Sequence, residues 1–285
     1  MAPDLRKAAR TLLTGIGQVM LQENPVTGLF FFAGLLVASP LMCAGAVFGV
    51  VTAMLTAHSL KLPENNTSAG LYGFNAALVG IALPYFFMPS LPLIGLIVAG
   101  SVLSVLIMHW QLKKLPLPAY TSAFVVTTWG AYALAKALHL DPATHASFTS
   151  AIPDGGVLDG VGQVMFQDNV FTGLLFALGI LYNSRSHGCC ALGGSVVGVL
   201  VATALQCPPD LIADGIFSYN AVLCAVALSG KTSLKDLAYP GACAAASVMV
   251  LLLFQKAGII ALTAPFVLSS WLFVYIRRKT GWPAS

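Results

Sequence analysis

The residues best suited to bind a solute belong to a motif that occurs twice. The motif reads G-[IV]-G-Q-V-M-[LF]-Q-[ED]-N and occupies residues 15–24 and 160–169. Gln18 and Gln163 each offer a side-chain carbonyl that accepts hydrogen bonds and an amide that donates them. A helix that ends at this motif would add backbone carbonyls without intrahelical partners, at the negative end of its dipole. Such groups suit a neutral solute with N–H donors, although the glutamines could instead fasten the helices to their neighbours.

Two further pairs of polar residues fall at matching places in the two copies. Glu23 and Asp168 are the ninth residues of the two motif copies. A carboxylate within a membrane is a functional candidate by default, but we favour hydrogen bonds to neighbouring backbone N–H groups that hold the turn. Thr121 and Thr263 lie near the start of an apolar segment. Each hydroxyl could serve a solute or bond back to its own helix, and their pairing leaves both interpretations open.

Apolar side chains at helical spacing accompany these polar groups: Phe74, Leu78, Phe166, Tyr219 and Leu223. Spacing alone favours ordinary packing for them. The histidines lie at or near the ends of the apolar segments, and the cysteines show no metal-ligand spacing. No cofactor, nucleophile or acid/base pair is recognisable, so an enzyme is not expected.

The composition places these residues in a membrane protein. The chain is 58% apolar and only 8% charged, whereas soluble domains are about 25% charged. There is too little charge to cover a water-facing surface, so most of the exterior must face lipid. The basic N-terminus lacks a small-residue cleavage site, and we expect the first segment to be retained. Nothing indicates a nucleic-acid partner.

Ten apolar segments are candidate membrane spans. Those of the first half lie near residues 25–40, 41–60, 70–88, 91–110 and 119–138, and those of the second half near 170–184, 189–206, 212–229, 238–255 and 258–277. With a cytoplasmic N-terminus, all of the 14 Lys and Arg residues except Lys136 and Lys256 fall on the cytoplasmic side. Cytoplasmic loops collect such residues. The pattern therefore predicts a multi-pass protein of the cell (inner) membrane with both termini in the cytoplasm.

Two shorter segments do not fit this count. Residues 11–21 and 155–166 are helical in character but cover only about 16–18 Å at 1.5 Å per residue. Asn24 and Asn169 follow them, and Pro25 follows Asn24; these are natural turn residues. We interpret both segments as re-entrant half-helices. The alternative is that each extends the next span into one long, tilted helix.

An internal repeat organises all of these segments. Residues 15–36 and 160–181 are identical at 13 of 22 positions, and the same shift of 145 aligns LYGFNAALVGIAL (71–83) with IFSYNAVLCAVAL (216–228). The predicted first repeat covers residues 1–140 and the second 141–285. Each contains five spans and one half-helix, and because five is odd the second copy must be inverted. Inverted repeats with broken helices place a solute site near the membrane midplane.

The paired glutamine motifs, the LYGFNAAL and IFSYNAVL segments, and LPAYTSAF with ALTAPF resemble the urea transporter family over nearly the whole chain. The resemblance implies an all-α homotrimer in which each protomer has its own urea pore between its two repeats, with facilitated, channel-like permeation and no coupling ion. By the same resemblance, one half-site comprises Gln18, Val19, Leu21, Phe74, Leu78 and Thr121. The other comprises Gln163, Val164, Phe166, Tyr219, Leu223 and Thr263. Leu21 stands where the family would have an aromatic side chain.

Two other kinds of transporter stay open as alternatives. One is a channel for a different small neutral solute, such as ammonia, a short amide or water. Ammonia conduction would be expected to need histidines in the middle of the spans, which the sequence lacks. The other is a secondary active carrier that uses Glu23 or Asp168 for coupling.

Overall fold

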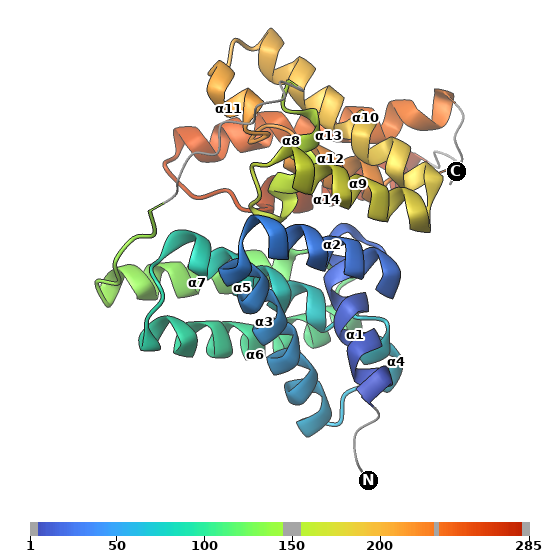
Figure 1. The fold of residues 1–285 in the computed structure, drawn as a ribbon. Helices are drawn as coiled ribbons and strands as arrows, with labels where there is room; N and C mark the ends of the chain where they lie inside the picture. The colour runs from blue at the N-terminus through green and yellow to red at the C-terminus, as the bar shows by residue number, and fades with distance from the viewer. Residues whose placement is uncertain (1–4, 145–154, 231–233, 281–285) are drawn as a thin grey trace. The chain divides into compact units, whose positions relative to one another are not determined.

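The computed structural model describes residues 5–144, 155–230 and 234–280, and within them the regular structure is helical (Figure 1). The chain divides into two compact units, Met1–Ser147 and Phe148–Ser285. Residues 145–154, near the predicted boundary between the repeats, and Lys231 lie outside the described residues.

The elements of the first unit run from blue to green in Figure 1. They are α1 (Leu5–Gly17), η1 (Gln18–Met20), α2 (Pro25–Ala38), α3 (Pro40–Ser59), α4 (Glu64–Ser68), α5 (Gly73–Phe86), α6 (Leu91–Lys114) and α7 (Ser122–Ala137). The second unit repeats this order as α8 (Val157–Gly162), η2 (Gln163–Met165), α9 (Val170–Asn183), α10 (Arg185–Ala204), α11 (Pro209–Ala213), α12 (Tyr219–Ala227), α13 (Leu234–Lys256) and α14 (Ala264–Thr280).

The same residues begin the matching helices of the two units. Asn24 and Asn169 are the N-caps of α2 and α9, and their side chains accept backbone N–H groups of the first turn. Ser39 caps α3 in the same way, and Ser184 caps α10. A side-chain acceptor at this position satisfies an N–H that the helix itself cannot. The predicted turn residues are thus confirmed at Asn24 and Asn169.

A sharp bend separates each predicted half-helix from the helix that follows. Leu5–Met20 meets Pro25–Ala38 at 78°, and Val157–Met165 meets Val170–Asn183 at 81°. The alternative of one long continuous helix is therefore wrong. The first half-helix is also longer than expected, because α1 begins at Leu5 rather than near residue 11. Its first turns pack on α4, where Lys7 and Glu64 form an exposed ion pair at 2.8 Å.

Helices occur in all ten predicted spans, but they differ in length. Within the part of the chain that the structure describes, four are long and apolar enough to cross a membrane, or up to six if each bent pair is counted as one span. The prediction for residues 212–229 needs correction, since this stretch is divided between the end of α11, a turn with Gly215 at φ 73°, and α12. With nine residues, α12 covers only about 14 Å. The composition predicted the apolar character but not the break.

Each unit buries small and aromatic side chains inside and leaves large apolar side chains on its surface. Phe31, Phe124, Phe176 and Phe266 are fully buried. On α6, in contrast, Leu91 is 82% exposed and Trp110 58% exposed. Water would disfavour so many exposed apolar side chains, whereas lipid does not. The surface is that of a multi-pass membrane protein.

The bent pairs pack by direct approach of their backbones. A Cβ added at Gly28 of α2 would overlap the carbonyl oxygen of Leu13 in α1. In the second unit, a Cβ at Gly173 would overlap the carbonyl oxygen of Leu158 in the same way. Glycine at these two positions therefore lets each half-helix lie against the helix that follows it.

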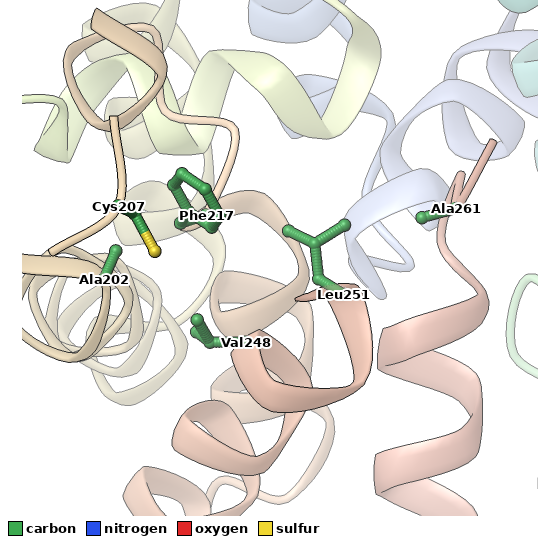
Figure 2. Close-up of a cluster of buried hydrophobic side chains, with 6 residues drawn as sticks. All are labelled: Ala202, Cys207, Phe217, Val248, Leu251 and Ala261. Atoms are coloured by element: carbon green, nitrogen blue, oxygen red, sulfur yellow. The ribbon is translucent and has the colours of Figure 1, made fainter. Parts of the chain in front are cut away.

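The second unit has an apolar cluster around the start of α12. Figure 2 shows its buried members, which are Ala202, Cys207, Phe217, Val248, Leu251 and Ala261. Leu211 and Leu252 pack against the cluster from its edge. Phe217 is 1% exposed, so its ring is a central part of this core.

Candidate functional site

Each half-helix ends in a Schellman-type turn that uses most, but not all, of its terminal carbonyls. In the first unit the N–H of Leu21 donates to Gln18 O at 2.9 Å, and the N–H of Gln22 donates to Gly17 O at 3.2 Å. The side-chain amide of Gln22 donates to Met20 O at 2.8 Å. Among the described residues, none donates a hydrogen bond to the carbonyl of Val19.

The second unit repeats this turn almost bond for bond. Phe166 N–H donates to Gln163 O at 3.0 Å, Gln167 N–H to Gly162 O at 3.2 Å, and the Gln167 amide to Met165 O at 2.8 Å. The carbonyl of Val164 receives no hydrogen bond from the part of the chain that the structure describes. Fewer than four carbonyls at each half-helix end therefore lack a hydrogen-bond donor. Those of Val19 and Val164 are among them, at matching positions of the two units.

Large side chains occupy the left-handed position of both turns. Leu21 has φ 61° and ψ 31°, and Phe166 has φ 62° and ψ 31°. Glycine is usual at this place in a helix C-terminus, and a side chain there costs on the order of 1–3 kcal/mol. Both copies keep a large apolar side chain despite this cost. The side chains at these two positions are therefore candidates for a functional role, as the family resemblance implies.

The two glutamines are equally buried but differently bonded. Gln18 and Gln163 are each 8% exposed. The amide of Gln18 donates to the carbonyl of Ala69 at 2.9 Å, so it fastens the half-helix to the end of α4. The side chain of Gln163 forms no hydrogen bond with the described residues. In the second unit the glutamine side chain therefore does not fasten the half-helix, and its amide donor and carbonyl acceptor are available to a solute.

The carboxylates do not hold the turns, contrary to the interpretation that we favoured. Glu23 is exposed. The turn at the start of α2 is held instead by the Asn24 side chain, whose Oδ1 accepts from Val26 N at 2.8 Å. Asn169 Oδ1 accepts from Thr172 N at 3.1 Å at the start of α9. The amide oxygen lies one residue closer to the helix, which places it in the N-cap position.

The elements that carry or adjoin the other predicted residues of each half-site pack against one another. In the first unit η1 contacts α5, and α5 contacts α7. In the second unit η2 contacts α12, and α12 contacts α14. The predicted residues on these elements are Val19, Phe74, Leu78 and Thr121 in the first unit, and Val164, Tyr219, Leu223 and Thr263 in the second. All of them are buried except Tyr219, which is partly exposed.

Comparison with known proteins supports the same assignment. Residues 9–278 match the family model described as urea transporter. The chain belongs to the urea transporter family. It is 27% identical to urea transporter 1 of Ovis aries over 297 residues, which cover 94% of this chain and 77% of the relative. It is 29% identical to urea transporter 1 of Mus musculus over 313 residues, with the same coverage.

Family membership establishes the function at a coarse level. The protein is a transporter, and it moves urea passively across a membrane. Urea is neutral and carries four N–H donors and one carbonyl. The half-sites offer the kind of acceptors that such a molecule needs, namely the carbonyls of Val19 and Val164 and the side chain of Gln163.

Two buried residues of this region were missed by the sequence analysis. Asn75 and Asn220 occur in the repeated GFNA and SYNA segments, and both are 0% exposed. The signal was present, because an asparagine buried in an apolar helix must find hydrogen-bond partners. Its repetition in both copies indicates a shared role.

Proposed function

We propose that urea crosses the membrane by channel-like permeation and that both half-sites contact it. The contacting residues are Gln18, Val19, Leu21, Phe74, Leu78 and Thr121 in the first unit, and Gln163, Val164, Phe166, Tyr219, Leu223 and Thr263 in the second. Oxygens along the edge of a narrow path would replace the water that urea loses, while apolar walls exclude hydrated ions. Binding must stay weak, since tight capture would block exit.

The observation that carries this proposal is the pair of vacant acceptors at the two half-helix ends. The turns at Leu21 and Phe166 use the same neighbouring carbonyls and leave the same one, that of Val19 or Val164, without a donor from the described residues. A carbonyl in a buried place costs free energy if it stays unbonded. Two matching vacancies in a urea transporter are well suited to the N–H groups of urea.

Transport assays of glutamine variants test the proposal. Gln163→Ala should lower urea flux into proteoliposomes about 5- to 100-fold, which corresponds to ~1–3 kcal/mol for an unmatched buried partner. Gln18→Ala should lower flux and also the unfolding temperature, because Gln18 holds Ala69. Thr27→Ala and Thr172→Ala serve as controls, since both residues are buried beyond the turn. They should affect folding more than flux; normal flux in both glutamine variants would exclude these half-sites.

A carrier is the alternative that one structural feature favours. The second unit has neighbouring carboxylates, since Asp168 and Asp210 lie close enough to Asp214 to interact with it electrostatically. The first unit has Ala69 at the position of Asp214. Channel-like passage predicts urea flux that is linear in the gradient and indifferent to a protonophore or to sodium removal. A collapse of flux with protonophore would favour proton coupling through these acids.

We also propose a homotrimer in the inner membrane with both termini in the cytoplasm. The distribution of Lys and Arg along the sequence supports the orientation, and the family resemblance supports the trimer. Reporter fusions at the two termini should both give the cytoplasmic signal. Termini on opposite faces would rule out the inverted repeat.

A further inference from the structure

Asn75 and Asn220 each bond to the start of a distant helix. Asn75 lies in α5, and its Oδ1 accepts the N–H of Phe124 at 3.0 Å. Asn220 lies in α12, and its Oδ1 accepts the N–H of Phe266 at 3.0 Å. Phe124 and Phe266 are the third residues of α7 and α14. The two contacts join residues 49 and 46 positions apart, so they are tertiary contacts that occur once in each unit.

These asparagines do the work of an N-cap from a neighbouring helix. The N–H groups in the first turn of a helix have no intrahelical acceptor, and the N-cap side chain usually supplies one. The N-cap of α7 is Thr121, and it makes no side-chain cap hydrogen bond. Asn75 supplies the acceptor instead. The start of α7, and with it Thr121, is therefore fixed by α5.

The residues just before the threonines adopt a backbone conformation that needs external support. Tyr120 and Leu262 both have φ 47°, in the left-handed region that side chains rarely adopt. In the second unit the carbonyl of Leu262 accepts the hydroxyl of Tyr219 at 2.6 Å and the amide of Asn220 at 3.4 Å. Asn220 thus binds the chain on both sides of Thr263.

The first unit holds its turn with fewer polar contacts from α5. The amide of Asn75 lies 3.8 Å from the sulfur of Met108, a weak acceptor. Phe74 stands at the position of Tyr219 and has no hydroxyl to donate. The Asn oxygen is therefore the shared element of both units, and the Tyr219 hydroxyl is an addition in the second.

We propose that Asn75 and Asn220 are positioning residues that fix Thr121 and Thr263 for the passage of urea, with Tyr219 as a second support of the Thr263 turn. The proposal rests on the proposed function, in which both threonines contact urea. Loosening either turn would let its hydroxyl move relative to the other oxygens of the half-site. Discrimination between urea and less complementary solutes should then fall together with the rate.

The test measures urea and acetamide permeability in proteoliposomes with matched protein content. Asn75→Leu and Asn220→Leu keep the volume but remove the acceptor, and each should lower urea flux about 10- to 100-fold and lower the urea-to-acetamide ratio. A merely structural role would reduce the number of active molecules and leave the ratio unchanged.

Tyr219→Phe provides a variant that should fold, because phenylalanine stands at the matching position 74. It should lower urea flux about 3- to 10-fold, as expected for one hydrogen bond, and lower the ratio as well. Tyr239→Phe is the matched control, since the Tyr239 hydroxyl also donates to a backbone carbonyl of α14, that of Phe273, far along the chain from Thr263. This control should leave the ratio unchanged.

The proposal is overturned if Tyr219→Phe and the folded Asn→Leu variants keep the wild-type ratio. The variants Thr121→Val and Thr263→Val show whether the positioning role of the asparagines is wrong or whether the threonines do not contact urea at all. Normal flux in both threonine variants would exclude the threonines from the urea path. Impaired flux in them beside normal asparagine variants would refute only the positioning role.

Discussion

The helices α5 and α12 occupy matching places in the two units. The side chains packed around the start of α5 are polar, whereas those around the start of α12 are apolar. In the first unit the hydroxyl of Tyr72 lies 2.9 Å from His109 Nδ1 and accepts from Asn66 Nδ2 at 3.4 Å. The second unit has Phe217, Leu252 and Leu211 at the matching positions, and they form part of one apolar cluster.

Helices α6 and α13 can be aligned by the burial of their residues as well as by sequence. With a shift of 143 residues, Ser104 and Val105 of α6 coincide with Ser247 and Val248 of α13, and all four are buried. The same shift places His109 on Leu252. A hydrogen-bonded group and an apolar cluster therefore fill the same place in the two units.

The comparison shows which features the repeat must keep and which can vary. At the bent pairs and at two helix starts the residues that constrain the backbone are alike in both units: Gly28 with Gly173, Asn24 with Asn169, and Asn75 with Asn220. Elsewhere they differ, since Gly45 and Gly80, whose backbones approach closely in the first unit, are matched by Cys190 and Ala225. Side chains that only fill space differ in polarity, provided that each buried polar group has a partner. Around the half-helix turns and the helix starts, backbone approach and capping are thus kept more strictly than the polarity of the packed side chains.

The largest effect is expected where the backbones approach most closely. Gly28→Ala and Gly173→Ala would each drive a Cβ into a backbone carbonyl, which no rotamer change can relieve. We expect a loss of at least about 3 kcal/mol and little folded protein after detergent extraction, with the same severity in both units. Size-exclusion profiles and unfolding temperatures measure this.

Two glycines without near neighbours serve as controls for this prediction. An added Cβ meets nothing within 4 Å at Gly130 of α7 or at Gly193 of α10. Gly130→Ala and Gly193→Ala should therefore express and unfold like the wild type. Normal folding of either clash variant would show that the approach of the bent pairs is looser than the structure indicates.

An intermediate loss of stability is expected when the polar and apolar side chains at matching positions are exchanged. Phe217→Tyr would bury a hydroxyl among leucines without a partner, at a cost of about 1–3 kcal/mol. Tyr72→Phe should cost about 1 kcal/mol, since His109 is only partly buried and can find another hydrogen-bond partner. Unfolding temperatures should therefore fall further for Phe217→Tyr than for Tyr72→Phe.

A double variant sharpens this second prediction. Adding Leu252→His to Phe217→Tyr recreates the Tyr–His pair of the first unit in the second. It should recover part of the lost stability if the two places are equivalent. Further loss in the double variant would show that the match between the units does not extend to side-chain geometry.

The smallest effect is expected at the wall of the half-site. Leu21→Phe gives the first turn the side chain that Phe166 already has at almost identical φ and ψ, so no added strain is expected. The larger ring should lower acetamide permeability relative to urea by a few fold, about 1 kcal/mol or less. Phe166→Leu should shift the ratio in the opposite direction. Unchanged ratios in both variants would place these side chains away from the urea path.

The sequence alone was sufficient for the membrane class and the ends of the half-helices. These features depend on composition and on residues close together in the chain, such as Asn24 beside Pro25, whose capping acts within three residues. For the same reason, the matching turns at Leu21 and Phe166 could be expected from the repeated motif.

Tertiary structure alone decided which polar groups have partners. The bond from Gln18 to Ala69 spans 51 residues, and that from Asn75 to Phe124 spans 49. No pattern of neighbouring residues encodes such contacts, because they depend on how α1, α5 and α7 pack. The sequence therefore presented Gln18 and Gln163 as equals, and packing made the first a fastener and left the second available for a solute.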